Sequence, residues 1–368
     1  MRIVQIANFY GASSGGLRTT LDALGRGYAA AGHERVLVVP GRRYAAVRSR
    51  ADGLRVTLPG LPVGGGYRMM VSPRTLRRLL LRLAPDSLEV SDKLTLVHTA
   101  AWARARGVRS VLFSHERADA ILAPRLPGWV PLAPLADGWN RRLAAGFDAV
   151  VAASAFSCAE FARVDAPAVH RVPLGVDLRV FTPPRAGAGA SAAQRAGVRL
   201  VFAGRLSAEK SPALPLETLR VLRRRGVDAR LDVLGDGPER ARLQRRAAGL
   251  PVRFHGHVAD RGAVAGLLTR ADVALVPCPV EAFGLAALEA LACGTPVVVA
   301  DAGAARELLA PGAGLAVGDS PGAVAEGVRT VLGWPEPVRR AAARKRAEEF
   351  PWARTVAGML RVHAGGAP

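Results

Sequence analysis

Glu281 and Glu289 stand eight positions apart in a segment whose residue types could bind a phosphorylated nucleotide. The apolar run 273–276 before them predicts a buried strand, and residues 285–292 predict a helix that a glycine and a proline then end. One carboxylate is therefore expected in the loop after a strand and the other inside the following helix. A carboxylate placed in this way can accept hydrogen bonds from a ribose diol, which is the role we predict for Glu289.

The loop between the two glutamates begins the helix, and its main chain could bind an anion. N–H groups around Phe283, Gly284 and Leu285 would point out of the helix N-terminus, where the helix dipole favours a negative group such as a diphosphate. These amides and the ribose-binding carboxylate together indicate a nucleotide that carries phosphates. An ordinary salt bridge of each glutamate remains the alternative.

A second loop supplies positive charge beside the first. Gly204, Arg205 and Lys210 follow the predicted strand 198–203 and precede a helix expected to start near Ser211 and Pro212, because serine and proline are helix-start signals. We expect both cations to overhang the crevice in which the anion would lie. Solvated basic side chains are the alternative.

These loops need elements that position them, and short apolar runs alternate with amphipathic segments along the whole chain. Strands are predicted at 3–7, 36–39, 110–113 and 149–152, and again at 198–203, 230–234, 252–254, 273–276 and 297–300. Such alternation predicts an α/β fold with parallel sheets covered by helices. Because 368 residues exceed the usual size of one core, we predict two doubly wound Rossmann-like domains that face each other across a cleft. Their expected ranges are 1–180 and 181–350, with the Pro/Gly/Ala-rich stretch 182–190 as the linker.

The formal charge of +21 raises nucleic acid as a partner, but two features weaken that interpretation. Nearly all the basic residues are arginines spread over many predicted helices, and aromatic residues are only 5% of the chain, too few for stacking platforms. The excess charge better suits an anionic membrane lipid, an anionic substrate or a genome biased toward arginine. A basic nucleic-acid-binding protein remains the remote alternative.

The remaining composition points to an intracellular chain. No apolar run approaches the roughly 20 residues that span a bilayer, and the N-terminus lacks signal-peptide regions, so we expect a cytoplasmic protein. Cys158, Cys278 and Cys293 show no metal-ligand spacing and are expected to be buried and reduced. The chain contains no Asp-x-Asp pair, so a metal that bridges a diphosphate has no obvious ligands.

The Glu281 to Glu289 segment resembles the Glu-x7-Glu signature of retaining glycosyltransferases of the GT-B fold, family four. Gly204, Arg205 and Lys210 resemble the family's Gly-Arg-(x)4-Lys element. The resemblance implies that Arg205 and Lys210 grip the donor diphosphate, without a metal, and that Glu281 holds the hydroxyls of the transferred sugar. It also implies retention by attack of the acceptor hydroxyl on the face that the diphosphate leaves, with the diphosphate taking the proton.

Other family motifs extend the expected donor site. The segment Gly256-His257-Val258 is similar to the family's Gly-x-Val segment, which implies that His257, Val258 and the nearby Asp260 read the nucleobase. An acidic residue there would suit a guanine amino group, and structural turns are the alternative. The Gly235-Asp-Gly-Pro238 turn also resembles the family pattern, whereas the family's Gly-Gly-x-Pro-Glu segment is replaced by 302–307, which leaves the role of Glu307 in doubt.

In the first half, Gly15 and Gly16 match a family Gly-Gly pair, which implies close approach of the backbone to the donor and acceptor. His115 follows the strand 110–113 and matches the family histidine that contacts the transferred sugar, with His98 as its rival. The expected catalytic residues are therefore His115, Glu281, Arg205 and Lys210. The family also implies that a C-terminal helix at 351–368 packs back on the first domain.

More narrowly, the whole chain resembles actinobacterial phosphatidylinositol mannoside mannosyltransferase-like proteins, particularly at 4–10, 14–18, 88–92 and 114–117. That similarity implies GDP-mannose as donor and a lipid-linked acceptor. A UDP-sugar enzyme with a soluble acceptor stays open. The basic segment 74–83 predicts a helix that packs its leucines on the sheet, and its arginines could face an anionic membrane.

Overall fold

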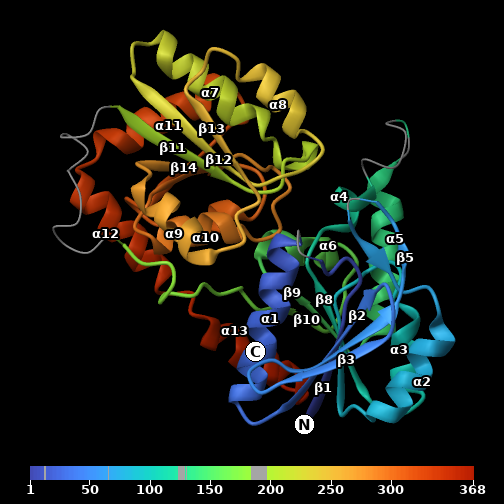
Figure 1. Ribbon diagram of the computed structural model, residues 1–368. Helices are drawn as coiled ribbons and strands as arrows, with labels where there is room; N and C mark the ends of the chain where they lie inside the picture. Colours follow the sequence, from blue (N-terminus) through green and yellow to red (C-terminus); the bar gives the residue numbers. More distant parts are fainter. Residues whose placement is uncertain (12–13, 65, 123–128, 130, 184–196) are drawn as a thin grey trace. The chain divides into compact units, whose positions relative to one another are not determined.

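The computed structural model describes residues 1–11, 14–64, 66–122, 129, 131–183 and 197–368. It divides into two compact units, which we call unit 1 (Met1–Leu174 and Trp352–Pro368) and unit 2 (Gly175–Pro351) (Figure 1). The boundary lies earlier than the predicted one at 180/181, because the N–H of Val176 already bonds to the carbonyl of Phe350 at the other end of unit 2. Most of the predicted linker, from 184 onward, lies outside the described residues.

Unit 1 contains a mainly parallel sheet. Its strand order among the described residues is β10-β9-β8-β7-β1-β2-β4-β3, in which only β3 runs antiparallel to its neighbour. The strands are β1 (Arg2–Ile6), β2 (Glu34–Gly41), β3 (Ala45–Ser49), β4 (Gly53–Pro59), β7 (Ser87–Val90), β8 (Arg109–Ser114), β9 (Ala149–Ala152) and β10 (Val169–Arg171), with β5 (Leu61–Pro62) and β6 (Arg68–Met69) as a separate short ribbon. Every strand predicted for the first half is confirmed, whereas β3, β4, β7 and β10 were not predicted.

The helices of unit 1 cover both faces of this sheet. They are α1 (Gly15–Ala30), α2 (Pro73–Leu83), α3 (His98–Arg104), α4 (Ala118–Leu122), α5 (Leu132–Gly146), α6 (Ala155–Ala162) and α13 (Trp352–His363). In α2, Leu76 and Leu80 are buried in the core while its arginines are exposed, as predicted. Helix α13, the last of the chain, packs beside α1 in unit 1, where a Cβ on Gly27 would lie 2.2 Å from a methyl group of Val356.

A buried polar network fixes α13 to the sheet. His363 and Glu89 are both fully buried, with 3.1 Å between Nε2 and Oε2, and Ser87 Oγ lies 2.7 Å from His363 Nδ1. Tyr28 and Gln5 donate hydrogen bonds of 2.7 and 2.8 Å to the two oxygens of Glu89. Burial raises the pKa of Glu89, but the hydrogen bonds from His363, Tyr28 and Gln5 outweigh it and hold that pKa below its ordinary value. The end of the chain is thus bonded to the centre of the unit 1 sheet.

Unit 2 contains a wholly parallel sheet. Its order among the described residues, β13-β12-β11-β14-β15-β16, is the strand order of a Rossmann fold. The strands are β11 (Val198–Ala203), β12 (Ala229–Leu234), β13 (Val252–Gly256), β14 (Val273–Val276), β15 (Val297–Ala300) and β16 (Gly314–Val317). All five strands predicted for this half are confirmed, and β16 was not predicted. The order reverses between β11 and β14, which marks the switch point where such sheets bind ligands.

Helices cover both faces of the unit 2 sheet. They are the 3-10 turns η3 (Ala208–Lys210) and η4 (Ala305–Leu308) and the helices α7 (Ala213–Arg224), α8 (Arg240–Arg246), α9 (Arg261–Arg270), α10 (Leu285–Ala292), α11 (Pro321–Gly333) and α12 (Glu336–Ala347). Helices α7, α8 and α11 lie on one face of the sheet, where their apolar side chains join its core, and α9 and α12 flank α10 on the other face. Figure 1 shows this arrangement of the helices. The helix 285–292 is confirmed, and the helix expected to start near Ser211 and Pro212 is α7, with Pro212 as its N-cap residue. Cys278 and Cys293 are buried as predicted, whereas Cys158 is only half-buried.

Candidate active site

Three of the predicted donor residues of unit 2 lie in loops at the switch point of its sheet. Gly204 and Arg205 directly follow β11, and Glu281 lies in the loop after β14, the neighbouring strand. Loops at the carboxyl ends of these two strands form the usual ligand site of a doubly wound sheet. Residues that are far apart in the sequence are therefore placed at one edge of the unit 2 sheet.

Lys210 and Glu281 form an ion pair at this edge of the sheet. Lys210 Nζ donates to Glu281 Oε2 at 2.8 Å, and both side chains are partly exposed. Lys210 ends η3, and the next residue, Ser211, takes a left-handed conformation with φ of 49° that turns the chain into α7. Arg205 is exposed on the same loop. Both predicted diphosphate cations thus lie at the solvent-facing edge of the sheet.

A glycine in the next loop permits the close packing of this turn. Gly204 donates its N–H to the carbonyl of Leu234 at 2.9 Å. A Cβ on Gly235 would lie 1.8 Å from the carbonyl oxygen of Gly204, and Gly235 has a φ of 131°. The Gly235 to Pro238 turn therefore has a structural role that requires glycine.

The N-terminus of α10 is built from Phe283, Gly284 and Leu285. Gly284 is the N-cap residue with φ of 100°, and a Cβ there would lie 3.2 Å from Ala305. Phe283 is buried and packs edge to face against Phe350, at 6.3 Å between ring centroids. The three residues thus place the first amides of α10 at the carboxyl end of β14, where the sequence predicted them.

Glu289 lies within α10 and has a partner that the sequence did not indicate. Its carboxylate is buried, and Arg261 Nη2 donates to its Oε1 at 2.5 Å. Burial raises the pKa of Glu289, and the Arg261 guanidinium opposes that rise. Arg261 is the first residue of α9, directly after Asp260, so its position in the sequence gave no sign of this contact.

The residues predicted to read the nucleobase lie between β13 and α9. His257 and Asp260 are exposed and Val258 is half-buried. Asp260 is the N-cap residue of α9, where its Oδ1 accepts a hydrogen bond of 2.9 Å from the N–H of Gly262. One oxygen of this carboxylate therefore has a structural partner, and its contact with a base remains a prediction.

His115 and the two glycines belong to unit 1. His115 follows β8, stacks on Phe113 with 4.3 Å between ring centroids, and lies 3.1 Å from the hydroxyl of Ser91 through Nε2. Burial lowers the pKa of His115 to about 4, so the ring is neutral at physiological pH. Its rival His98 begins α3 and contacts the carbonyl of Thr95. Ser91, which holds the ring of His115, was not predicted to contribute.

Gly15 and Gly16 are the exposed first residues of α1, after the N-cap Ser14. A Cβ on Gly15 would meet no described atom within 4 Å. The packing of the protein therefore does not itself require glycine at position 15.

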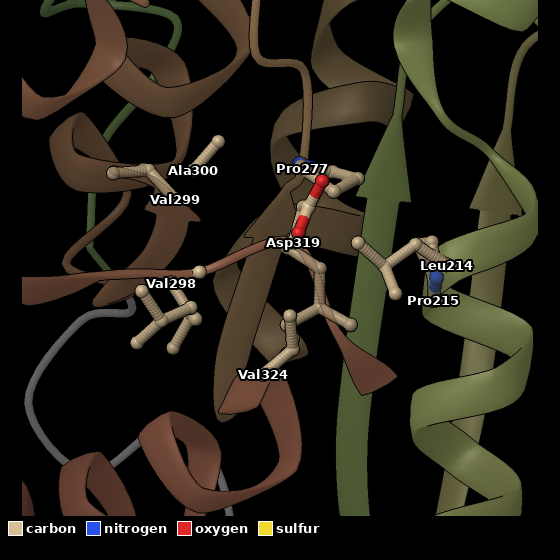
Figure 2. A pocket seen from close by; sticks show the side chains of 11 residues that line it. Leu214, Pro215, Pro277, Val298, Val299, Ala300, Asp319 and Val324 are labelled. Atoms are coloured by element: carbon tan, nitrogen blue, oxygen red, sulfur yellow. The ribbon is translucent and has the colours of Figure 1, made fainter. Parts of the chain in front are cut away.

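The described parts of the chain include a small buried cavity and an open hollow. Figure 2 shows the first, an apolar cavity of about 10 Å³ in the core of unit 2, about the size of one water and too small for a nucleotide. Its lining residues are Leu214, Pro215, Leu275, Pro277, Val298, Val299, Ala300, Val317, Gly318, Asp319 and Val324. The second is an open hollow of about 250 Å³ in unit 1, at the carboxyl ends of β1, β2 and β4. It is lined by Tyr10, Gly11, Arg18, Val39, Pro40, Arg55 and Thr57.

Neither a metal-binding cluster nor a membrane-spanning helix is found in the described residues. No group of three or more His, Cys, Asp or Glu side chains there is arranged to hold a metal ion. Likewise, none of the described helices combines the length and apolar character needed to cross a bilayer.

Comparison with known proteins identifies the family of both units. Residues 14–180 match the family described as Glycosyltransferase Family 4, and residues 197–333 match the family described as Glycosyl transferases group 1. The chain is 48% identical, over 98% of its length and 95% of the relative's, to the GDP-mannose-dependent alpha-(1-6)-phosphatidylinositol dimannoside mannosyltransferase of Mycobacterium tuberculosis. It is 32% identical to the corresponding monomannoside mannosyltransferase of Mycolicibacterium smegmatis, over 67% of this chain and 69% of that one.

A solved structure shares the fold. The sucrose-phosphate synthase of Thermosynechococcus elongatus superposes with a TM-score of 0.79 over 99% of this chain and 98% of that one, at 19% identity. The likeness agrees with the two parallel sheets described above and supports the GT-B fold expected from the sequence. The near full-length relative, the two family matches and the fold show that the chain belongs to glycosyltransferase family 4 and is a glycosyltransferase of the GT-B fold.

Proposed function

We propose that this glycosyltransferase transfers mannose from GDP-mannose to a phosphatidylinositol mannoside, with retention of the anomeric configuration. The observation that carries the proposal is the 48% identity to the mycobacterial dimannoside mannosyltransferase over nearly the whole chain. This identity extends through both units.

In this proposal the donor binds at the switch point of unit 2. Its diphosphate accepts hydrogen bonds from Arg205, from Lys210 and from the first amides of α10, and Lys210 leaves Glu281 for the phosphate oxygens. Glu281 then accepts hydrogen bonds from the hydroxyls of the mannose. The ion pair of 2.8 Å between Lys210 and Glu281 keeps both side chains at this edge before the donor arrives.

The chemistry needs no side-chain nucleophile. The acceptor hydroxyl attacks the anomeric carbon on the face from which the diphosphate departs, so the old C–O bond breaks as the new one forms. The hydroxyl proton passes to a phosphate oxygen of the leaving GDP. Preorganised cations stabilise the charge that grows on the diphosphate, and we assign this role to Arg205 and Lys210, without a metal ion. To His115, whose ring is neutral and held by Ser91, we assign the sugar-contacting role that the family resemblance implies.

The hollow of unit 1 suits the charged part of the acceptor. Arg18 and Arg55 line it together with Tyr10, and two guanidinium groups around 250 Å³ of open space match a phosphodiester. We assign the phosphate of the glycolipid to this hollow.

The exposed arginines of α2 suit the membrane in which such a lipid resides. Arg74, Arg77, Arg78 and Arg82 all face solvent, and each basic residue near an anionic membrane adds about 1 kcal/mol of attraction. We propose that the enzyme associates peripherally with the inner face of the cell membrane through this helix.

The test is a transfer assay with the purified protein in detergent. GDP-mannose and UDP-glucose are each offered with a phosphatidylinositol mannoside or with a soluble mannoside, and the products are separated by mass. We expect mannosyl transfer from GDP-mannose to the glycolipid, and none in the variant Glu281→Gln. Faster transfer from UDP-glucose, or to the soluble acceptor, would overturn the donor or the acceptor assignment respectively.

Membrane association is tested by co-sedimentation with vesicles. The wild-type protein should sediment with vesicles rich in phosphatidylinositol and not with neutral phosphatidylcholine. Replacing Arg74, Arg77, Arg78 and Arg82 by glutamine should abolish this binding. The matched change of four exposed arginines in unit 2, Arg224, Arg225, Arg242 and Arg245, should leave it intact; equal loss in both variants would contradict a role of α2.

A further inference from the structure

The ion pair between Arg261 and Glu289 has a geometry that an ordinary structural salt bridge does not need. Arg261 Nη2 donates to Glu289 Oε1 at 2.5 Å, and the guanidinium carbon lies 4.7 Å from the centroid of the Phe181 ring. The aromatic face and the carboxylate together fix the guanidinium at the start of α9. The Arg261 side chain nevertheless remains 44% exposed.

Only one oxygen of the Glu289 carboxylate accepts a hydrogen bond from a described residue. Glu289 is 8% exposed, and its Oε2 has no hydrogen bond to any residue that the structure describes. Arginine can bind both oxygens of a carboxylate with two parallel N–H groups, and a buried carboxylate is costly when an oxygen lacks a donor. A monodentate bond therefore leaves an acceptor available at the carboxyl end of the sheet.

We propose that Arg261 is a positioning residue for the donor nucleotide: it fixes Oε1 of Glu289 and keeps the carboxylate charged, so that Oε2 accepts hydrogen bonds from the ribose hydroxyls. This inference rests on the proposed function, because it assigns the ribose of the nucleotide to Glu289. Arg261 itself acts through Glu289 and does not take part in the transfer.

The charge of Glu289 depends on Arg261 more than on any other group around it. Burial raises the pKa of Glu289, and only Arg261 opposes this among the described groups. From α12, Arg344 is directed to the carbonyls of Ala292 and Phe181, and in η4 Arg306 bonds to the carbonyl of Asp301. The neighbouring Cys293 is an uncharged thiol, because burial raises its pKa to about 11.

Removal of Arg261 should therefore make nucleotide binding sensitive to pH. A positive partner at this distance lowers a carboxyl pKa by about one to three units, so its loss raises the pKa of Glu289 by a comparable amount. A protonated carboxyl has one oxygen that can no longer accept. Binding should then weaken as the pH falls, beginning at a higher pH than in the wild-type protein.

The experiment measures the Kd of GDP-mannose by calorimetry from about pH 5 to about pH 8. This ligand is suitable because its diphosphate is a diester with no proton to titrate in that range. In Arg261→Gln, the pH at which binding is half lost should move upward by about one unit or more. Arg261→Lys keeps the charge and should return the midpoint close to that of the wild type. Arg270→Gln, at the exposed other end of α9, is the matched control and should leave the profile unchanged.

Glu289→Gln identifies the titrating group, since this variant should bind weakly with no pH midpoint in the range. If Arg261 merely stabilised α9, Arg261→Gln would weaken binding equally at every pH, and this result would overturn the inference while leaving the proposed function in place. Failure of the wild-type protein to bind GDP-mannose at any pH would instead overturn the proposed function and the inference with it.

Discussion

Replacing His363 by alanine should loosen the last helix of the chain from unit 1. The imidazole lies between Ser87 and Glu89, at 2.7 and 3.1 Å, and both it and the carboxylate are fully buried. The alanine variant leaves the carboxylate in place with the donors Tyr28 and Gln5 but without its third partner. Removing one member of a buried pair costs about 3–5 kcal/mol, because the charge that remains is poorly compensated.

This cost translates into a measurable shift in melting temperature. For a unit of about 190 residues, each kcal/mol lowers the Tm by about 2–4 °C, so the unit 1 transition in scanning calorimetry should fall by about 10 °C. Hydrogen exchange should also become faster in α13 than in α1. His170→Ala, which changes a half-buried histidine on the edge strand β10, is the matched control and should cost about 1 kcal/mol or less.

The pH dependence gives a second test of the same reasoning. In the wild-type protein the pKa of Glu89 is lowered, so its contribution to stability is present above the ordinary carboxyl pKa and is lost as the pH falls through the lowered value. Without His363, the effect of burial on the Glu89 pKa is opposed by fewer donors, so that pKa rises. The difference in Tm between variant and wild type should therefore shrink from about pH 7 to about pH 4. A variant that melts within about 1 °C of the wild type would refute the role of this network.

Three shorter predictions concern the site in unit 2. Alanine at Arg205 or Lys210 should lower kcat about 10²-fold in the transfer assay because each removes a preorganised cation, and unchanged rates in both variants would point to another source of positive charge. Excess EDTA should leave the transfer rate unchanged, whereas a loss that Mg²⁺ or Mn²⁺ restores would refute the metal-free assignment. Gly284→Ala should destabilise unit 2 by about 1–3 kcal/mol in calorimetry, since φ is 100° and Ala305 lies 3.2 Å from the new Cβ. Its control Gly322→Ala, where a Cβ meets nothing within 4 Å, should melt no lower than the wild type.

Elements whose residues carry their own signal could be predicted from the sequence. The strand Val273–Val276 and the helix Leu285–Ala292 have the predicted bounds, because an uninterrupted apolar run specifies the strand, and Gly294 and Pro296 end the helix. The family could also be predicted from the sequence, since its motifs are short and lie in the loops after these strands.

Elements stabilised by distant partners could not be predicted in the same way. In β7, Glu89 interrupts the apolar pattern of a strand, and its burial is explained by hydrogen bonds to Gln5, Tyr28 and His363, the last of which is 274 positions away in the sequence. The hairpin of β3 and β4 lies in a segment whose arginines obscure the alternation of a strand. A charged residue within an apolar run suggests a loop in the sequence when its buried partner is not known.

In the site, likewise, the sequence identified single residues but not the contacts between them. The sequence indicated Lys210, Glu281 and Glu289 separately, but it could not show that Lys210 pairs with Glu281 or that Arg261 pairs with Glu289. Such contacts depend on which strands are neighbours in the sheet. The order of β11 and β14 decides the first pair, and the packing of α9 against α10 decides the second.

Unit 2 is inserted into the sequence of unit 1, and its two ends lie next to each other. Val176 and Pro351 form a β-bridge, so the first and last residues of unit 2 lie next to each other. On the other side of the boundary, the hydroxyl of Thr355 donates to the carbonyl of Pro173 at 2.8 Å, so the two cut ends of unit 1 are also adjacent. Residues 175–351 thus resemble a guest domain inserted into a host. A few glycines in their place would join Leu174 to Trp352 with little disturbance of the host, and the excised guest would begin and end at one point on its surface.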